Sequence, residues 1–344
     1  MIIPTRRQLI RPALAATGLA LLGTSGLRAQ PAKRPVRFAL DWTWQSAHSG
    51  WTLAADRGYF ANAGLDVTID RGFGSGDTMT KVAGGAYDIG FADTNLLLKF
   101  NHENPGNQLT SVFVLYDASP NATIFLKSSG ITKPKDLEGR KVSATDGEGT
   151  RLLFPIFARA NKIETTKIEF QSVNAQLRDA LVVQRRVDAT LGFLTTTALN
   201  MVGSGVPLND IGWLQYNNYG VELYSSGLIC RKDYAEKNPE VVEGFITATI
   251  RGLRDMLAEP KEAMASLKRR EPLIDEKIEI SRNELVNQVA LLTPNVRANG
   301  VSTVNRERFE RVAGQVAEAF DLSIRPQMDF TYTERFLPAD RRIV

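Results

Sequence analysis

From residue 36 onward, short strand-like runs alternate with amphipathic segments of helical period, and this alternation constrains the fold more than any other feature. The runs VRFAL (36–40), LDVTID (65–70) and YDIGFAD (87–93) have the length and composition of strands. The segments HSGWTLAADRGYF (48–60) and GDTMTKVAGG (76–85) between them are typical of helices. Strands that alternate with helices form parallel sheets with helices on both faces. The sequence therefore predicts an α/β fold with parallel-rich sheets.

The alternation continues through most of the chain. Further strands are predicted at 111–117, 122–127, 141–145, 167–173 and 187–193, with helices from Gly149 onward and at 175–185. After Gly227 one more strand precedes predicted helices at 239–258, 260–270, 275–292 and 305–319. The segments 66–95 and 167–197 repeat one order, strand, loop, helix and a strand after an Asp, which favours two similar lobes.

The first 29 residues have the pattern of a secretory signal peptide. A basic start is followed by an apolar run, Pro12–Gly23, that is too short for a membrane-spanning helix. Arg6-Arg7 in TRRQLI matches the twin-arginine export pattern, and we expect cleavage near Ala29. The sequence thus predicts a soluble periplasmic protein.

Removal of residues 1–29 changes the net charge and the length of the mature chain, and with them the expected partners and number of lobes. This segment contains four Arg and no acidic residue, so a chain of net charge +4 becomes a mature chain with no net charge. The basic composition therefore gives no reason to expect a nucleic-acid or membrane partner. About 315 residues remain, more than one core usually holds, so two lobes are expected. Cys230 lies alone in an apolar run, where we expect a buried side chain rather than a reactive thiol.

Three of the four Trp residues lie within ten positions, after the first predicted strand. In open parallel sheets, ligands bind beyond the carboxyl ends of the strands. Trp42 and Trp44 lie on such a loop, and an indole stacks on flat ligands. We expect at least one of them in a cleft, although both could pack into the core. Trp51 falls inside the following helix, among apolar neighbours, so we expect it in the core.

Two glycine-rich loops also follow predicted strands. GFGSGD (72–77) has the spacing GxGxG, which differs from the dinucleotide-binding pattern, and Asp77 would repel a pyrophosphate. Ser75 or Asp77 could cap the next helix, or the amides of 75–77 could bind a ligand. TDGEGT (145–150) allows close approach of the backbone, and Arg151 is the obvious cation nearby.

A family resemblance rests on several residues and segments spread along the chain. They are Asp41, Trp42, His48, Gly58-Tyr59-Phe60, Gly64-Leu65-Asp66-Val67, and the later segments 205–229 and 332–338. The chain resembles the solute-binding proteins of ABC importers for nitrate, sulfonates, taurine and thiamine pyrimidine precursors. That superfamily also contains the fungal thiamine pyrimidine synthase. The resemblance covers nearly all of 36–338.

The resemblance implies a two-lobed periplasmic binding protein of the venus-flytrap type. Lobe one would comprise 36–118 plus 228–330, lobe two 122–222, and the C-terminal tail 331–344. The crossovers would lie near Ser119-Pro120-Asn121 and Tyr224-Ser225-Ser226. A permease in the inner membrane would be the partner of a monomer. In the synthases the matching His is consumed as a nitrogen donor; here His48 would bond to a ligand nitrogen or serve a structural role.

Loops at the carboxyl ends of the predicted strands, together with the resemblance, supply the candidate ligand-binding residues. They are Asp41, Trp42, Trp44, His48, Ser75, Gly76, Asp93, Thr94, Gly149, Thr150, Phe193, Tyr219 and Glu222. Acids predominate in the predicted cleft, where Asp77, Asp146 and Glu148 join three of these residues against Arg151 and His48. Such a cleft suits a planar solute with N–H donors better than a sulfonate or nitrate.

Three functions stay open on this reading. The first is a binding protein for a planar, possibly nitrogen-heteroaromatic solute, and a sulfonate or taurine binder is its alternative. The second is a synthase-like enzyme, which the absence of the fungal Cys-rich stretch disfavours. The third is a periplasmic sensor. With two His in the chain, a His-rich metal site is excluded, and we expect neither a cofactor nor catalytic residues.

Overall fold

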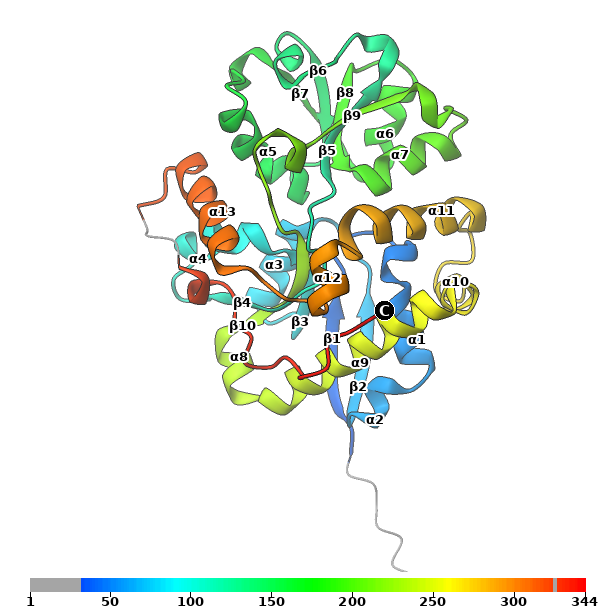
Figure 1. Cartoon of the computed structure of the whole chain (residues 1–344), viewed down its shortest axis with the longest axis vertical. Coiled ribbons are helices and arrows are strands. Elements are labelled where there is room, and N and C mark those ends of the chain that lie inside the picture. Colours follow the sequence, from blue (N-terminus) through cyan, green and yellow to red (C-terminus); the bar gives the residue numbers. More distant parts are fainter. Residues whose placement is uncertain (1–31, 324–326) are drawn as a thin grey trace, which may run out of the picture. The chain divides into compact units, whose positions relative to one another are not determined.

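The structure is a computed structural model that describes residues 32–323 and 327–344. Residues 33–344 form one compact unit (Figure 1). The predicted signal peptide, 1–29, lies outside the described residues. None of the helices in the described parts of the chain combines the length and hydropathy needed to cross a membrane.

The first of two five-stranded sheets contains β1 (Arg34–Ala39) next to β2 (Leu65–Asp70) and β3 (Ile89–Asp93). β10 (Ser226–Arg231) and β4 (Leu109–Val114) complete it, in the order β2-β1-β3-β10-β4. β1 pairs in parallel with β2 and β3, whereas β10 runs antiparallel to β3 and β4.

The second sheet repeats this plan. Its order is β7-β6-β8-β5-β9, and β6 pairs in parallel with β7 and β8. β5 runs antiparallel to β8 and β9. The strands are β5 (Asn121–Leu126), β6 (Lys141–Ala144), β7 (Glu169–Ser172), β8 (Ala189–Phe193) and β9 (Ile211–Gln215). The predicted α/β class is confirmed, but half of the pairings in each sheet are antiparallel. The strand that returns from the other sheet enters in the opposite direction, which an apolar run does not reveal.

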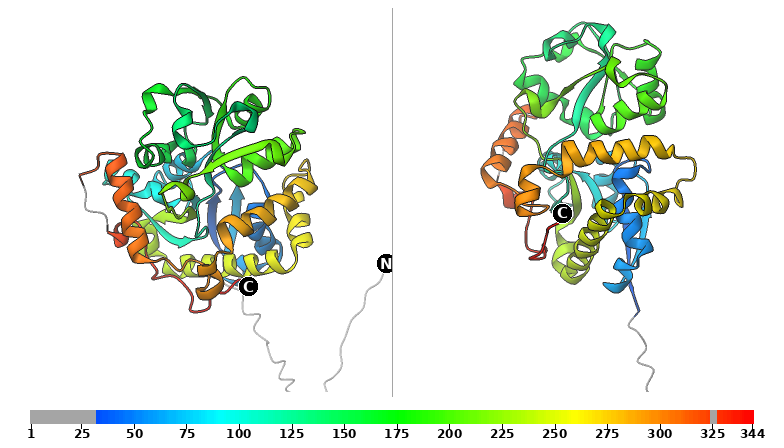
Figure 2. Two further views of the ribbon diagram at one scale, coloured as in Figure 1. Left: turned by 45° about the horizontal axis from the view of Figure 1, so that its top comes forward. Right: turned by 45° about the vertical axis from the view of Figure 1, so that its right-hand side comes forward.

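Helices flank both sheets (Figure 1). They are α1 (Ser49–Asp56), α2 (Tyr59–Asn62), α3 (Ser75–Ala83), α4 (Leu97–Glu103), α5 (Gly149–Ala160), α6 (Ala175–Val183), α7 (Leu194–Gly203), α8 (Lys232–Lys237), α9 (Pro239–Ala258), α10 (Pro260–Lys268), α11 (Glu276–Val286), α12 (Pro294–Asn299) and α13 (Arg306–Ala319). The predicted first helix breaks at Gly58, which adopts a left-handed conformation with φ of 71°. α11 continues into a π-helical turn, Asn287–Leu291, and lies beside α7 (Figure 2).

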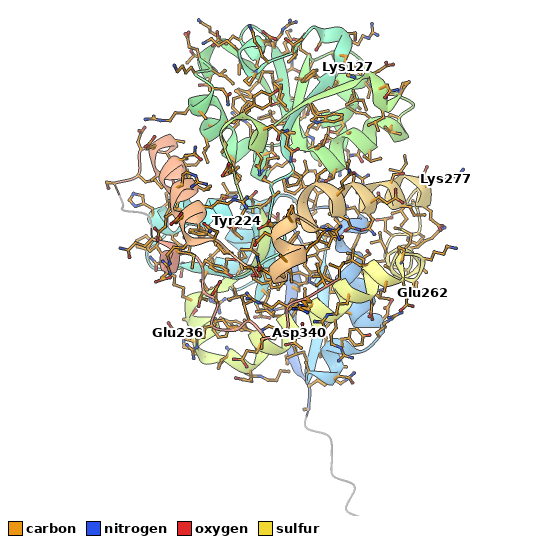
Figure 3. All side chains as sticks on the ribbon, viewed as in Figure 1. Lys127, Tyr224, Glu236, Glu262, Lys277 and Asp340 are labelled. Atoms are coloured by element: carbon orange, nitrogen blue, oxygen red, sulfur yellow. The ribbon has the colours of Figure 1, made fainter. Side chains whose placement is uncertain are left out.

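Side chains divide between core and surface as their chemistry requires. Trp51 is buried, as predicted, and its Nε1 donates to Thr249 Oγ1 at 3.1 Å. Cys230 is buried in β10 and unpaired. Figure 3 shows Lys277 and Glu262 projecting outward, whereas Tyr224 lies inside the protein. The tail 331–344 has no helix or regular strand, but Tyr332 in it is buried and bridges to Ser111.

The chain passes between the two sheets twice, at 115–120 and at 216–225, and these crossovers bond to each other. The amide of Ser119 donates to Leu223 O at 3.1 Å, and that of Ser225 donates to Tyr116 O at 3.0 Å. The resemblance implied crossovers near Ser119-Pro120-Asn121 and Tyr224-Ser225-Ser226. The division into two lobes stays a prediction.

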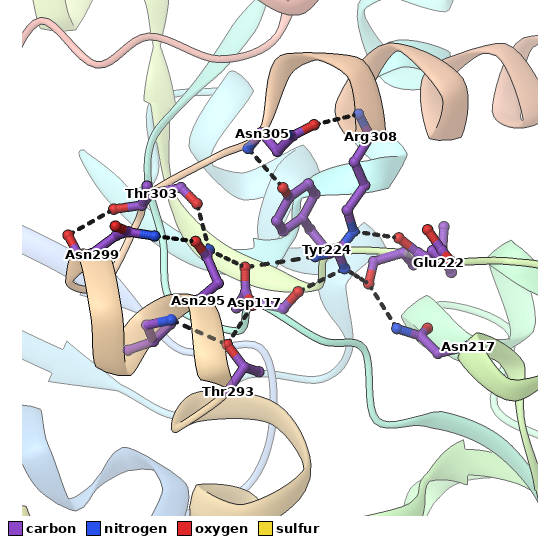
Figure 4. Close-up of polar contacts among 12 residues, drawn as sticks. Asp117, Asn217, Glu222, Tyr224, Thr293, Asn295, Asn299, Thr303, Asn305 and Arg308 are labelled. Carbon is purple, nitrogen blue, oxygen red and sulfur yellow. Dashed lines mark hydrogen bonds and ion pairs between the residues drawn. The ribbon is translucent and has the colours of Figure 1, made fainter.

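Arg308 of α13 joins the two crossovers from outside (Figure 4). Its Nη2 donates to the carbonyl oxygens of Asp117 at 2.7 Å and Leu223 at 2.9 Å, and its Nε donates to Glu222 O at 2.9 Å. The Asp117 carboxylate accepts from Asn295 Nδ2 at 3.0 Å. One guanidinium thus bonds main-chain oxygens of both passages.

Candidate ligand-binding site

A pocket of about 330 Å³, part of it open to solvent, lies where strands of both sheets end. Four segments line it: the loop after β1, the start of α3, the start of α5, and the junction of β8 with α7. The lining residues are Asp41, Trp42, Gln45, Gly74, Ser75, Glu148, Gly149, Phe193 and Thr196. The pocket therefore occupies the position at which open α/β sheets bind ligands.

Asp41 is held on two sides at the pocket wall. One carboxylate oxygen accepts a hydrogen bond from Ser226 Oγ at 3.1 Å, and the other lies 3.4 Å from His48 Nε2. His48 itself is 1% exposed and lies behind Asp41, outside the lining. The amide of Gly74 donates to Asp41 O at 2.7 Å. The loop is thereby fixed, and the carboxylate faces the pocket with capacity to accept further hydrogen bonds.

Trp42 and Phe193 supply aromatic walls. Trp42 is partly buried, and the Cζ of Arg178 lies 5.3 Å from its ring centroid. Trp44, two residues on, packs against the apolar core beside the first sheet and does not line the pocket. The two indoles were equal candidates in the sequence, and the turn of the loop separates them.

Glu148 is the second carboxylate of the pocket. It forms a salt bridge with Arg178, whose Nε also bonds Asp179 Oδ1 at 2.8 Å. Burial raises the pKa of Glu148 to about 7, against the opposing effect of Arg178, while the nearby charges of Asp179 and Asp41 raise the pKa further. Glu148 therefore titrates near neutral pH.

Asp93 lies beneath the pocket rather than in its lining. It is fully buried and accepts hydrogen bonds from Asn95, Asn121 and Ser225. Burial raises the pKa of its carboxyl group. Its amide donates to Ser75 Oγ at 3.0 Å. Asp93 therefore ties the start of β5 and the second crossover to β3, which is a structural role.

The two glycine-rich loops contact each other. The amide of Gly76 donates to Gly147 O at 3.1 Å, so it is not free for a ligand. A Cβ on Gly74 would lie 2.4 Å from the same oxygen, and Gly74 has φ of 117°. Of the two alternatives for this loop, capping of α3 by Ser75 or Asp77 does not occur, because Gly74 is the N-cap and no side chain caps it. Asp77 pairs with Lys81 at 2.7 Å instead.

Four other candidates lie away from the lining. Thr94 Oγ1 donates to Ser225 O at 2.9 Å, and Thr150 Oγ1 donates to Asn121 Oδ1. Tyr219 packs edge-on against Phe157. Glu222 is exposed and pairs with Arg311 at 2.8 Å, because it lies on the outer side of the second crossover.

Fewer acidic side chains line the pocket than the sequence predicted for the cleft. Asp146 accepts a hydrogen bond from Ser172 Oγ, and Asp77 and Glu222 have cationic partners elsewhere. Arg151, the expected cation, lies 4.0 Å from the Phe170 ring centroid. Asp41 and Glu148 are the carboxylates in the described lining, and Arg178 is the cation behind them.

Sequence reasoning missed Gln45, Thr196 and Arg178. Thr196 Oγ1 donates to Gln45 Oε1 at 3.1 Å, so these two lining residues join the two sides of the pocket. Gln45 lies on the loop after β1 and Thr196 in the first turn of α7, directly after β8, so their positions after predicted strands were a usable signal. Arg178 lies in mid-helix, where a cation is usually solvated, and nothing in the sequence marks it. The described residues contain no group of His, Cys, Asp or Glu placed to hold a metal ion.

A protein-family model described as NMT1/THI5 like matches residues 45–263 of the chain. Riboflavin-binding protein RibY of Chloroflexus aurantiacus is 23% identical, over 90% of this chain and 88% of the relative. The formylaminopyrimidine-binding protein of Halalkalibacterium halodurans is 26% identical, over 73% of this chain and 75% of the relative. A 4-amino-5-hydroxymethyl-2-methylpyrimidine phosphate synthase of Legionella pneumophila is 24% identical, over 89% and 93%.

Solved structures share the fold. The alkanesulfonate-binding protein SsuA of Xanthomonas axonopodis pv. citri, bound to MOPS, superposes with a TM-score of 0.66 at 13% identity, covering 87% of this chain and 96% of its own. The periplasmic aliphatic sulphonate binding protein SsuA of Escherichia coli gives a TM-score of 0.65 at 15% identity, covering 86% and 96%. The chain therefore has the periplasmic binding protein fold.

Proposed function

Because this chain belongs to the NMT1/THI5-like family, we propose that it is a solute-binding protein that captures a small planar, nitrogen-containing ring. The observation that carries the proposal is one pocket lined by Trp42, Phe193 and two carboxylates, Asp41 and Glu148. An aromatic wall stacks on a flat ring, and carboxylates accept charge-assisted hydrogen bonds from ring or amino N–H groups.

The charge of the pocket supports this class over the anionic alternatives. The described lining contains no Lys or Arg. The guanidinium behind it already bonds Glu148, Asp179 and Thr197. A sulfonate or nitrate would therefore meet carboxylates without a free cation.

The relatives are consistent with the same class. Two of them are named for binding riboflavin and a formylaminopyrimidine, both flat nitrogen heterocycles. We propose further that the protein is exported as a monomer and delivers its solute to the permease of an ABC importer.

The synthase among the relatives supplies the second candidate, an enzyme. A histidine that is consumed as a nitrogen donor must reach its substrate. His48 is buried behind Asp41 and does not line the pocket, which favours binding over synthesis. Peptide mass mapping of the protein after incubation with pyridoxal phosphate distinguishes the two. An unchanged His48 peptide supports a binding protein, and loss of mass there supports the enzyme.

Thermal-shift titration with a formylaminopyrimidine, riboflavin, taurine and nitrate tests the ligand class. We expect the pyrimidine to raise the melting temperature most. Trp42→Ala should weaken its binding by about fivefold or more, since stacking contributes on the order of 1 kcal/mol beyond burial. Trp213→Ala, which removes an exposed indole on β9, is the matched control and should leave binding unchanged. Strongest binding of taurine or nitrate would favour the sulfonate-type alternative.

A further inference from the structure

The side chain of Arg178 is fully buried, and each nitrogen of its guanidinium group has a partner. Nε donates to Asp179, Nη1 donates to Glu148, and Nη2 donates to Thr197 Oγ1 at 2.8 Å. Removing a charge from water is costly unless such partners replace the water. Arg178 is therefore fixed in one orientation by hydrogen bonds to three residues.

The fold leaves room for this group at one point of β8. A Cβ on Gly192 would lie 2.9 Å from Arg178 Cζ and 2.4 Å from Thr197 Oγ1, which is closer than real Cβ contacts. Gly192 has no positive φ that would demand glycine. The absence of a side chain there serves the packing of the guanidinium group.

Two neighbours of this guanidinium belong to the pocket lining, whereas Arg178 does not. They are Glu148, which accepts from Nη1, and Trp42, whose ring centroid lies 5.3 Å from Cζ. A guanidinium placed against an indole restricts the ring through cation–π attraction. The same cation draws the Glu148 carboxylate toward itself, which sets the direction of its remaining acceptor sites.

We infer that Arg178 is a positioning residue of the pocket, which fixes the Trp42 ring and the Glu148 carboxylate against each other from behind. The effect of Arg178 on ligand binding rests on the proposed function, whereas its effect on the position of the Trp42 ring is independent of that function. Lysine cannot replace Arg178, because an ammonium is a compact point charge and cannot bond three separated partners in one plane while lying against a ring.

Fluorine NMR on protein labelled with 5-fluorotryptophan tests the placement without any ligand. The four Trp resonances are assigned through Trp→Phe variants. In Arg178→Lys we expect the Trp42 resonance to shift and broaden while that of exposed Trp213 stays in place. Thr197→Val, which removes one partner of the guanidinium, should have a smaller effect in the same direction. Arg57→Lys is the matched control, because Arg57 also bonds two carboxylates, Asp255 and Glu259, but at another site.

A folded Arg178→Lys protein with an unchanged, sharp Trp42 resonance would overturn the inference. If Arg178→Lys shows no cooperative thermal unfolding, the Trp42 resonance of Thr197→Val is used instead. An unchanged, sharp resonance in that variant would likewise overturn the inference.

Ligand affinity in two backgrounds gives a second measurement, which distinguishes positioning of the Trp42 ring from a general contribution of Arg178 to stability. With a formylaminopyrimidine as the probe, Arg178→Lys should raise Kd about tenfold in the wild-type background. It should have much less effect in a Trp42→Ala background, since the ring it positions is gone. Equal losses in both backgrounds would contradict the positioning role. If the pyrimidine does not bind wild-type protein, the proposed function fails, and the fluorine spectra still decide the inference.

Discussion

At the scale of single residues, Asp41 gives the sharpest distinction between candidate solutes. Its carboxylate lines the pocket and is held by Ser226 and His48, so Asp41→Asn changes charge with little change in shape. For an aminopyrimidine we expect about a tenfold rise in Kd, because charge-assisted hydrogen bonds are roughly twice as strong as neutral ones. Taurine should bind the variant better than wild type.

Isothermal titration of both ligands measures this difference. Asp146→Asn is the control: its carboxylate bonds Ser172 outside the lining, and neither affinity should change. Tighter binding of taurine than of the pyrimidine by wild type, together with a gain in Asp41→Asn, would assign the pocket to anions.

Glu148 makes stability depend on pH. Its pKa lies near 7 in the folded protein and near 4.5 in the unfolded chain, so between these values the folded state binds more protons. Stability then falls as pH rises from about 4.5 to about 7, by an upper limit of roughly 3 kcal/mol. The charged groups that face Glu148 are Arg178 and Asp179 on α6 and Asp41 after β1.

Urea unfolding of wild type and Glu148→Gln at pH 5 and pH 8 tests this dependence. Glutamine does not titrate, so the loss of stability between the two pH values should be smaller in the variant. An equal loss in both proteins would show that other groups cause it.

The place of a residue in the pocket could be predicted where its position after a strand determines it. Asp41 and Trp42 were expected at the pocket because they directly follow the first strand, and Ser75, Gly149 and Phe193 follow others. Arg178 could not be predicted, since an arginine within AQLRDAL has the pattern of a solvated helix face. Its burial depends on Gly192, Thr197 and two carboxylates that folding brings together.

At the scale of elements, α3 and α5 meet through the loops that precede them. In Gly74→Ala a methyl group would overlap Gly147 O, and the backbone of Gly74, with φ of 117° and ψ of 152°, adds strain of about 1–3 kcal/mol for a residue other than glycine. We expect the loops to separate, with weaker ligand binding and a larger radius of gyration by small-angle scattering. Gly58→Ala is the control for a positive φ without a clash, because Gly58 has φ of 71° and open space around it. Equal radii for the two variants would count against the steric effect.

Elements were predictable where periodicity is strong. Each predicted strand and most long helices occur, but α4, α7, α8, α12 and β9 were missed. α7 contains Thr195, Thr196 and Thr197 in succession, and β-branched residues have low helix propensity. These side chains are buried, so packing and their hydrogen bonds overcome that preference.

At the scale of the whole molecule, Arg308 bonds to both crossovers. Arg308→Gln removes hydrogen bonds to main-chain oxygens of both passages. We expect faster hydrogen exchange at the amides of Ser119 and Ser225, with little change in the β-sheets. Arg311→Gln is the matched control on the same helix, since Arg311 bonds the exposed Glu222 carboxylate. Unchanged exchange in Arg308→Gln would show that the crossovers hold each other without it.

The hydroxyl of Ser226, which donates to Asp41, belongs to the strand that follows the second crossover. A solute that competes for Asp41 therefore alters a bond at the end of that crossover. Binding of the solute would thus change a contact next to the second crossover, 216–225, which lies outside the pocket lining. A fluorescent dye attached to a cysteine at exposed position Glu222 would then act as a reporter, and the protein would serve as a sensor for its own solute.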